Sequence, residues 1–330
     1  MSETATAVRI RESGDLDVLE IGEVPVRAPG PGEVLVEVAT AGLNRADIMQ
    51  RKGYYPAPPG YPADVPGLEF AGTVTALGEG VRDWSVGDRV MAITGGGAMC
   101  TRVVAHAREL MPVPEGMPFS EAAAIPEVFL TAWDALFNQA QAVMGETALI
   151  HAAASGVGTA AAQLCRAASV RALATVRTAD KLDRILKLGF ADGVVVKDGR
   201  FAAEVDRLTH GHGVDVVLDP VGASYLEDNL QAMAPLGRLV LIAFMGGMHA
   251  EVPLAPILMK RLRIFGTTLR ARPLEEKARV AREFSRSVLP LFARGKLKAV
   301  VDAVMPMSQI RDAHALMERN ATLGKIVLAW

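Results

Sequence analysis

Short apolar runs alternate with amphipathic segments through the middle of this chain. The apolar runs begin at Ala148, and each of the first five is followed by a helical pattern or a turn. Such alternation predicts parallel strands joined by crossover helices, and six strands of this kind make a doubly wound α/β sheet. After the run at Ala148, the predicted strands are Ala172–Val176, Gly193–Val196, Val214–Leu218, Arg238–Ala243 and Arg263–Thr268, and the predicted helices are Thr159–Ala168, Lys181–Leu188, Phe201–Leu208 and Tyr225–Met233.

The flanking regions have a different pattern. Up to about Pro118 the chain is rich in Gly, Pro and Val, with strand-like runs at Val34–Val38, Gly72–Leu77 and Arg89–Ala92. Strand and helix signals resume at Val300–Met305, Ser308–Arg319 and Gly324–Leu328. We therefore predict a discontinuous β-rich catalytic domain of residues 1–124 and 268–330. A nucleotide-binding domain, residues 125–267, is inserted in it, with the active site in the cleft between the two.

The turn after the first apolar run is glycine-rich. Gly156, Gly158 and Ala161 spell G-x-G-x-x-A, the spacing of a dinucleotide-binding turn. We expect Gly156 to adopt a backbone conformation that a side chain would resist, and Gly158 to let the chain approach a pyrophosphate. Free N–H groups at the start of the following helix would face the anion. The residues predicted to bind it are Ser155, Gly156, Val157 and Gly158.

The tip of the second strand indicates which dinucleotide. An acidic residue that holds the adenosine ribose of NAD lies about 20 residues beyond the first glycine. Here that region reads V-R-T-A-D-K, and its tip carries Arg177 rather than an acid. Arg177, Thr178 and Lys181 are suited to a 2′-phosphate, although solvated loop charges are the alternative. Two exposed charge-assisted hydrogen bonds could favour NADPH over NADH by about 100-fold.

Composition and charge fit an ordinary enzyme. The 330 residues are 50% hydrophobic and carry a formal net charge of -2, so no basic face for nucleic acid is indicated. Two cysteines cannot build a disulfide framework, and the start M-S-E-T-A-T lacks the features of a secretory signal. Residues 148–165 are apolar, but their glycines and polar side chains make a poor membrane span. We expect a cytoplasmic protein without membrane or nucleic-acid partners.

Several ordered motifs resemble one family over nearly the whole chain. They are A-G-L-N-R-A-D (Ala41–Asp47), P-G-L-E-F-A-G (Pro66–Gly72), V-G-D-R-V (Val86–Val90), L-T-A-W (Leu130–Trp133), A-S-G-V-G-T-A-A (Ala154–Ala161), L-D-P-V-G (Leu218–Gly222) and G-K-I-V-L (Gly324–Leu328). The chain is similar to the zinc-free medium-chain dehydrogenase/reductases. Among these it most resembles the quinone oxidoreductases, and especially the tumour-suppressor-inducible type. The resemblance implies a Rossmann sheet with a β-rich GroES-like domain, NADPH as cofactor and a quinone or related acceptor.

The resemblance also bears on metal binding. Zinc-dependent relatives carry a cysteine where Asn44 aligns and a histidine at the Leu68 position. Cys100 and Cys165 cannot supply a four-thiolate site and are expected to pack rather than react. His106, His151 and the T-H-G-H-G turn at Thr209–Gly213 are interpreted as chance or solvent-exposed histidines. We predict no zinc.

Without a Lewis acid, the acceptor must already be electrophilic, as a quinone or an α,β-unsaturated ketone is. We expect direct hydride transfer from NADPH, with the final proton taken from water. Asn44 is the candidate orienting group, and Tyr55 could donate a hydrogen bond or wall the pocket, with Tyr54 second. Asp47 could structure this loop, or serve as a helix cap or salt-bridge partner.

Other site residues follow from the resemblance alone. It implies that Thr131 contacts the cofactor, that Phe244, Met245 and Gly246 pass the nicotinamide ribose, and that Leu269 and Arg270 line the nicotinamide side. Asn320 and Lys325 would close over the phosphates. The alternatives are core packing for Phe244 and Leu269 and a surface charge for Lys325. Gly95–Gly97 is either a mobile segment beside the cleft or a plain turn.

Two further expectations concern partners and activity. The sixth predicted strand, Arg263–Thr268, would be a sheet edge, and pairing it with its mate would make a homodimer, as the family does. The alternatives to a quinone reductase are an NADPH-dependent alkene reductase acting on enones or enoyl thioesters, for which Tyr55 is the obvious proton donor, and a non-catalytic NADPH-binding protein.

Overall fold

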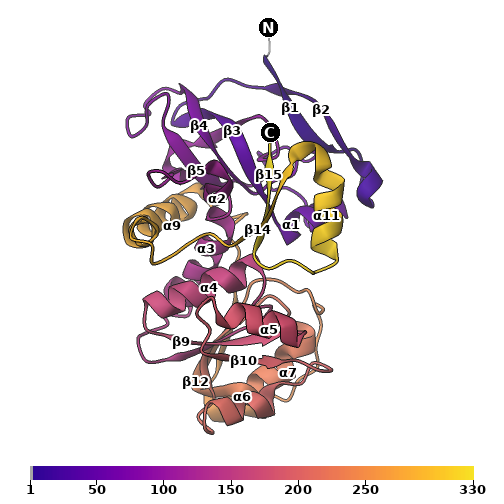
Figure 1. Ribbon diagram of the computed structural model, residues 1–330, viewed down its shortest axis with the longest axis vertical. Helices are drawn as coiled ribbons and strands as arrows, with labels where there is room; N and C mark the ends of the chain where they lie inside the picture. The colour runs from indigo at the N-terminus through magenta and orange to yellow at the C-terminus, as the bar shows by residue number, and fades with distance from the viewer. Residues whose placement is uncertain (1–2) are drawn as a thin grey trace. The chain divides into compact units, whose positions relative to one another are not determined.

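The computed structural model describes residues 3–330, which divide into two compact units (Figure 1). Unit 1 consists of the residues up to Leu130 together with Leu269–Trp330, and unit 2 is Thr131–Thr268. The first division falls within helix α3 (Pro126–Trp133), later than the residue 124 expected from the sequence.

Unit 2 is built on six parallel strands in the order β10-β9-β8-β11-β12-β13. The chain starts in the middle, winds outward through β9 and β10, and then returns to wind outward the other way. The strands are β8 (Thr147–Ile150), β9 (Arg171–Val176), β10 (Asp192–Val195), β11 (Val214–Asp219), β12 (Met233–Leu241) and β13 (Arg263–Gly266). This confirms the predicted doubly wound sheet. Its switch point, between β8 and β11, is where ligands bind in such sheets.

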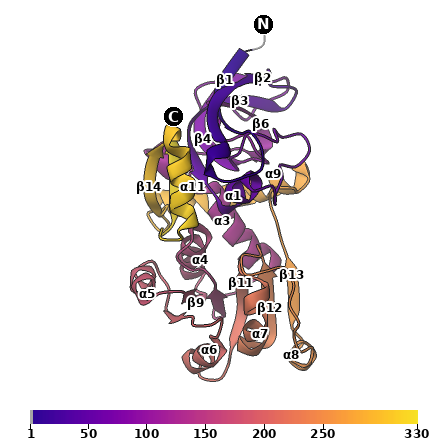
Figure 2. The ribbon, with the colours of Figure 1, turned by 90° about the vertical axis from the view of Figure 1, so that its right-hand side faces the viewer.

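Crossover helices connect the strands of unit 2, as Figure 2 shows for α4 to α8. Right-handed crossovers place α4 and α5 on one face of the sheet and the later helices on the other. The helices are α4 (Gly156–Ala167), α5 (Ala179–Leu186), α6 (Ala202–Leu208), α7 (Ala223–Ala232) and α8 (Ala255–Lys260).

The core of unit 2 explains why these runs are strands. Leu149, Leu173, Val217 and Leu239 come from four neighbouring strands, and all are fully buried in one cluster. Burial of each such side chain stabilises the fold by about 1.5–3 kcal/mol. Because a parallel sheet is covered on both faces, its strands are continuous apolar runs, which is the pattern that the sequence carries.

Unit 1 is β-rich. Its seven-stranded sheet has the order β14-β15-β3-β4-β5-β7, with β6 paired to β3, and β1 and β2 form a separate antiparallel pair. The strands are β1 (Glu3–Ile10), β2 (Leu19–Val26), β3 (Glu33–Leu43), β4 (Glu69–Leu77), β5 (Arg89–Ile93), β6 (Arg102–His106), β7 (Met111–Pro112), β14 (Val301–Pro306) and β15 (Lys325–Ala329). The helices are α1 (Arg45–Arg51), α2 (Phe119–Ala122), most of α3, α9 (Leu274–Ser287), α10 (Leu289–Ala293) and α11 (Ile310–Glu318).

One strand pairing in unit 1 joins distant parts of the sequence. β15 lies antiparallel to β3, with Ile326 opposite Leu43 and Leu328 opposite Ala41. β4 pairs with the other edge of β3, so the starts of β4 and β15 lie close to the end of β3. This register brings Lys325, Glu69 and Asn44 together.

Candidate functional site

The glycine turn of unit 2 forms the start of α4. Ser155 is the N-cap residue, and its hydroxyl accepts the Gly158 N–H at 3.1 Å. A Cβ on Gly158 would lie 2.5 Å from the Ala153 carbonyl oxygen, so only glycine fits there. The expectation for Gly156 is wrong: it is the first helical residue, and Ala152 takes the left-handed position with φ 48°.

This helix start fits a dinucleotide pyrophosphate. In the described part of the chain, the N–H groups of Gly156 and Val157 donate to no protein acceptor. Unused N–H groups at a helix N-terminus, with the positive end of its dipole, form a site for an anion. The absence of a side chain at Gly158 leaves the turn compact, as its close approach to Ala153 shows.

The tip of β9 carries the residues predicted to hold a 2′-phosphate. Arg177 follows the strand directly and is exposed, Thr178 is the N-cap residue of α5, and Lys181 is half-buried in the first turn of that helix. Arg177 also acts on Tyr225 of α7: burial raises the pKa of this phenol, and the guanidinium opposes the rise. An exposed cation is therefore available where an acidic residue would contact a ribose.

Two loops at the carboxyl edge of the sheet are tied together. The Asp219 carboxylate accepts the N–H groups of Val221 and Gly222 at 2.6 and 2.9 Å, and Gly222 begins α7 with φ 81°. Met245 and Gly246, which follow β12, donate to Pro220 and Val221 at 3.1 and 2.7 Å.

The predicted nicotinamide segment lies in the second of these loops. Phe244 is 55% exposed and Met245 is 50% exposed. Core packing is therefore the wrong alternative for Phe244. Thr131, a further predicted cofactor contact in unit 2, is half-buried in α3.

A buried polar chain runs beneath these loops. Thr175 bonds to His151 Nδ1 at 2.8 Å, His151 Nε2 bonds to Asn229 Oδ1 at 2.7 Å, and Asn229 donates to Asp219 at 2.9 Å. Because the Asn229 amide nitrogen faces Asp219, its oxygen must accept, and the His151 proton is placed on Nε2. Burial lowers the pKa of His151, which keeps it neutral. The interpretation of His151 as an isolated or exposed histidine is wrong.

In unit 1, Asn44 and Asp47 organise the start of α1. They form a capping box, in which the Asp47 carboxylate accepts the Asn44 N–H at 2.8 Å. The other oxygen of Asp47 accepts the Gly67 N–H at 2.9 Å. Burial raises the pKa of Asp47 to about 6, against the lowering effect of these two bonds. Helix capping, one of the roles considered for Asp47, is what the structure shows.

Lys325 is at the centre of the buried charges in unit 1. Its side chain forms an ion pair with Glu69 at 2.6 Å and donates to the Leu43 carbonyl at 2.7 Å and to Asn44 Oδ1 at 2.6 Å. It is 3% exposed, so the alternative of a surface charge is wrong. The register of β15 against β3 makes this lysine a core residue.

The side chain of Asn44 is occupied by the protein. Its amide nitrogen donates to Glu69 at 2.9 Å and to the Gly42 carbonyl at 3.3 Å, while its oxygen accepts from Lys325. Orientation of an acceptor by Asn44 stays a prediction, and in this arrangement the amide already has protein partners on both of its ends.

A carboxyl group that sequence reasoning missed adjoins this cluster. Glu127 is half-buried in the first turn of α3, and its N–H donates to the second oxygen of Glu69 at 2.7 Å. Burial, followed by the charge of Glu69, raises the pKa of Glu127 to about 8. The one signal in the sequence is that Glu127 is the only charged residue between Ala122 and Trp133.

Arg270 holds the tyrosine loop in place. Its guanidinium donates to the carbonyls of Gly95 and Tyr55 at 2.8 and 3.0 Å and to the side chain of Gln50. It also lies over the Tyr55 ring, 4.8 Å from the centroid. Arg270 is 4% exposed, so its described contacts are structural.

The other residues of this loop differ in exposure. Tyr54 is 74% exposed, whereas Tyr55 is half-buried, and burial raises the pKa of its phenol. Gly95, Gly96 and Gly97 are buried, and a Cβ on Gly95 would collide with the Tyr61 ring. The triple glycine is therefore a packed turn.

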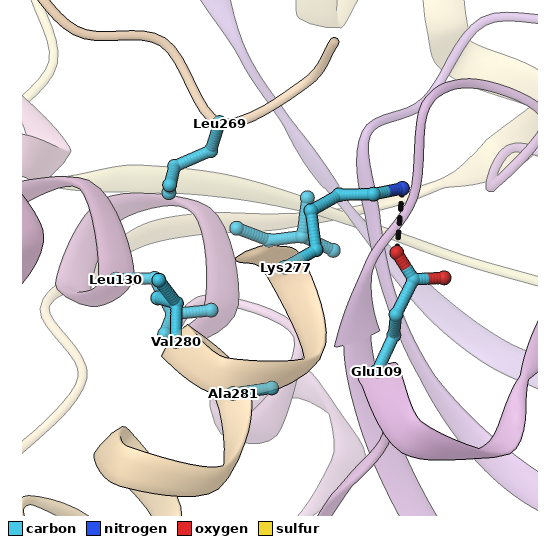
Figure 3. Close-up of a pocket in the computed structure, with 7 residues that line it drawn as sticks. Glu109, Leu130, Leu269, Lys277, Val280 and Ala281 are labelled. Atoms are coloured by element: carbon cyan, nitrogen blue, oxygen red, sulfur yellow. Dashed lines mark ion pairs between the residues drawn. The ribbon is translucent and has the colours of Figure 1, made fainter. Parts of the chain in front are cut away.

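A small cavity of about 20 Å³, enough for one water molecule, lies beside this region in unit 1 (Figure 3). The neighbouring Lys277 forms an ion pair with Glu109 at 2.5 Å and donates to the Tyr61 hydroxyl at 2.9 Å. Leu269, predicted to face the nicotinamide, lines the cavity and is 7% exposed. Asn320, predicted to close over the phosphates, accepts a bond from Arg45 at 2.6 Å.

No helix in residues 3–330 is long and apolar enough to span a membrane, and no group of three or more His, Cys, Asp or Glu side chains in this range is arranged to hold a metal ion. Both cysteines are buried, and burial raises the pKa of Cys165 to about 12, so these thiols pack as expected.

Comparisons with known proteins agree with this architecture. Residues 30–115 match the alcohol dehydrogenase GroES-like domain, and residues 156–286 match the zinc-binding dehydrogenase family. The chain is 30% identical over 317 residues to the synaptic vesicle membrane protein VAT-1 homolog of Homo sapiens, covering 91% of this chain and 80% of that protein. It belongs to the medium-chain dehydrogenase/reductase superfamily.

Solved structures of this superfamily are similar over the full length. A structure described as an NAD-dependent alcohol dehydrogenase is 34% identical, with a TM-score of 0.86 over 98% of this chain and 99% of its own. The CurK enoyl reductase is 30% identical, with a TM-score of 0.85 over 98% and 99%. This medium-chain dehydrogenase/reductase is accordingly an NAD(P)-dependent oxidoreductase with a small-molecule substrate.

Proposed function

We propose that this medium-chain dehydrogenase/reductase is an NADPH-dependent quinone oxidoreductase that acts on a quinone or a similar electron-poor carbonyl compound without zinc. The exposed Arg177 at the tip of β9 carries the cofactor half of the proposal. A guanidinium there can form a charge-assisted hydrogen bond with a 2′-phosphate, whereas the 2′-hydroxyl of NADH offers it no charge.

The pyrophosphate of NADPH would be held by the start of α4. Ser155 fixes the turn, while the N–H groups of Gly156 and Val157 have no protein acceptor among residues 3–330. When bound, NADPH supplies the hydride. Phe244, Met245 and Gly246 are proposed to contact its nicotinamide half, with Thr131, Leu269, Arg270 and Asn320 as further cofactor residues.

The proposal of an electron-poor acceptor and no zinc rests on the side chains of Asn44 and Leu68. An amide and an isobutyl group are not the thiolate and imidazole that zinc prefers. Lys325 and Glu69 bind the Asn44 side chain on both ends instead. Hydrogen bonds must then polarise the carbonyl group of the acceptor. Because they polarise it less than a metal ion does, the acceptor should already be electrophilic. The half-buried Tyr55 phenol, fixed by Arg270, is the proposed donor.

Reduction of an activated alkene is the second candidate. The similarity to the CurK enoyl reductase, which is 30% identical, favours it. Enoyl and quinone acceptors both take a hydride at an electron-poor carbon, so the same tyrosine could serve either reaction.

We also propose a homodimer formed through the edge of the unit 2 sheet. β13 is the last strand and is paired on one side only in the described chain. The adjacent α8 exposes Leu258 and Met259 by 77% and 79%. Exposed apolar side chains beside an unpaired strand edge are typical of a surface covered by a partner. The molar mass in solution tests this proposal.

The oxidation of NADPH tests the proposed activity. Turnover is measured with 1,4-benzoquinone, 9,10-phenanthrenequinone and an enone, each with NADPH and NADH, and with a chelator. We expect chelator-insensitive quinone turnover that prefers NADPH. R177A should reduce that preference by roughly 10-fold, because one charge-assisted bond is lost. R184A, on the same unit, is the control.

Three outcomes contradict parts of the proposal. Turnover restricted to the enone would assign the enzyme to alkene reduction. Tight NADPH binding without turnover would favour a non-catalytic NADPH-binding protein. An unchanged cofactor preference in R177A would remove the phosphate role of this arginine.

A further inference from the structure

A buried histidine begins the turn that leads into α4. His151 follows β8 and is 1% exposed, and its backbone N–H donates to the Leu218 carbonyl of β11 at 3.1 Å. Two residues later, the Ala153 N–H donates to the Thr175 carbonyl of β9 at 3.1 Å. The glycine turn of unit 2 is therefore attached to both strands that flank β8.

The residue between these two anchors has an unfavourable backbone conformation. Ala152 has φ 48°, in the left-handed region that an alanine seldom adopts. Such a conformation persists only where the surrounding structure imposes it, and it occurs most often at binding sites. Here the anchors at His151 and Ala153 impose it. The chain then reaches Ser155, whose hydroxyl accepts the Gly158 N–H at the start of α4.

The hydrogen bonds of the His151 ring have one direction. The Asn229 amide nitrogen donates to the Asp219 carboxylate at 2.9 Å, so the amide oxygen accepts the His151 Nε2 proton at 2.7 Å. Nδ1 of the neutral ring then has a lone pair, which accepts the Thr175 hydroxyl at 2.8 Å. The ring also packs edge-on against Tyr225, with the two centroids 4.9 Å apart. Its orientation is therefore fixed on every side.

The two ends of this chain reach the segments proposed to bind the two halves of the cofactor. Thr175 is two residues before Arg177, the proposed 2′-phosphate contact. At the other end, the Asp219 carboxylate accepts two backbone N–H groups of residues 220–222, and the loop after β12 donates two backbone N–H groups to this same segment. His151 lies between the two ends and carries the glycine turn.

We propose that His151 is a positioning residue of the cofactor site: its ring, bound to Thr175 and to Asn229, sets the distance between the glycine turn and residues 220–222, so that one dinucleotide can contact the segments at both places. This inference rests on the proposed function, which assigns the pyrophosphate to the start of α4 and the nicotinamide half to the loop after β12. A ligand that occupies only one of these places does not depend on the distance between them. His151 should therefore matter more for a whole dinucleotide than for half of one.

The binding of NADPH and of its adenosine half, 2′,5′-ADP, tests the proposal by calorimetric titration. H151L removes both bonds of the ring, so NADPH should bind about tenfold more weakly, whereas the affinity for 2′,5′-ADP should change by less than about twofold. H151Q keeps a side-chain N–H that can reach Asn229, and it should recover part of the NADPH affinity. T175V removes one hydroxyl with little change in volume and should weaken NADPH binding by about threefold. H212L, at an exposed histidine of the same unit, is the control.

The two ligands separate positioning from a merely structural role. A loss of stability with unchanged NADPH binding in folded H151L would overturn the proposal, as would equal losses for NADPH and 2′,5′-ADP. A wild-type protein that prefers NADH would contradict the proposed 2′-phosphate contact, and NADH with 5′-AMP would then provide the same test of His151. A wild-type protein that binds NADPH but reduces no acceptor would contradict the proposed function and leave the binding test intact.

A spectroscopic measurement needs neither ligand nor activity. Nitrogen NMR of the histidine side chains should show one ring, missing from H151Q, that carries its proton on Nε2 and exchanges it slowly with solvent. T175V should shift the Nδ1 resonance of this ring. A proton on Nδ1 in the wild-type protein would overturn the proposal, because the ring could then not donate to Asn229. An Nδ1 resonance that is unchanged in T175V would overturn it as well.

Discussion

In unit 1 a lysine balances the buried carboxylate of Glu69, whereas in unit 2 backbone N–H groups and a side-chain amide hold the buried carboxylate of Asp219. Lys325 binds Glu69 at 2.6 Å, and the Asn44 side chain forms hydrogen bonds with both members of this ion pair. Asp219 instead accepts two N–H groups at the start of α7 and one from the Asn229 amide. Backbone N–H groups stabilise the Asp219 carboxylate without a second charged side chain. The neutral His151 can therefore take part in the chain of hydrogen bonds that leads to it.

The two units also differ in how the polar groups around these carboxylates are bonded. In unit 1 one lysine serves three acceptors, and burial together with the charge of Glu69 raises the pKa of the neighbouring Glu127 to about 8. In unit 2 every member of the chain from Thr175 to Asp219 has a hydrogen-bond partner, which fixes the loops that precede α7 and follow β8. Fully satisfied polar networks of this kind give rigidity.

Removal of the lysine should have the largest effect on this contrast. K325M leaves the Glu69 carboxylate buried without its cation, which costs about 3–5 kcal/mol of unfolding free energy. Guanidinium denaturation measures it. K298M, at an exposed lysine of the same unit, should change stability by less than about 0.5 kcal/mol. A loss below about 1 kcal/mol in K325M would show that Glu69 does not depend on Lys325.

Interruption of the hydrogen-bond chain from Thr175 to Asp219 should cost less unfolding free energy than removal of the lysine. N229L keeps the volume of the side chain but leaves His151 Nε2 and one oxygen of Asp219 without a partner, for a loss of about 2–3 kcal/mol. The same denaturation experiment applies, with Q231L on the exposed face of α7 as the matched control. If N229L is as stable as Q231L, the chain contributes nothing to unit 2.

The pH dependence of stability gives the smallest effect. The pKa of Glu127 is raised from 4.5 to about 8, so the folded state binds the extra proton and loses stability as pH rises through that window. E127Q should therefore be more stable than wild type by about 1–2 kcal/mol at pH 9 and nearly equal to it at pH 5. Denaturation midpoints at the two pH values measure this. Equal differences at both would contradict it.

Two buried histidines give stability the opposite dependence on pH. Burial lowers the pKa of His151 in unit 2 and of His314 in unit 1, the latter to about 3. Their contribution to stability is complete above pH 6.5 and is lost as pH falls below it. The comparison of E127Q with wild type isolates Glu127, because both histidines are present in each protein.

The strands of unit 2 could be predicted because their signal is local. Each is an apolar run of the right length, so the run at Val214–Leu218 corresponds to β11, Val214–Asp219. The capping role of Asp47 is also local, since the box spans three residues from Asn44.

The charged cluster could not be predicted in the same way. Lys325 lies next to Asn44 only because β15 pairs with β3 in one register, and nothing near residue 325 encodes that pairing. Glu127 and His151 gave a weaker signal, a single polar residue in an apolar run. Such a residue must find a buried partner, but the sequence does not tell which one.

The pairing of β3 with β15 also has a consequence during synthesis. Unit 2 is one continuous segment, so it can fold as soon as it leaves the ribosome. Unit 1 cannot, because the strand that carries its buried cation is translated after all of unit 2. The sheet around Glu69 and Asp47 therefore lacks Lys325 until the last part of the chain is made. In a nascent chain that stops before this residue, unit 2 is folded, whereas unit 1 on either side of it in the sequence is incomplete.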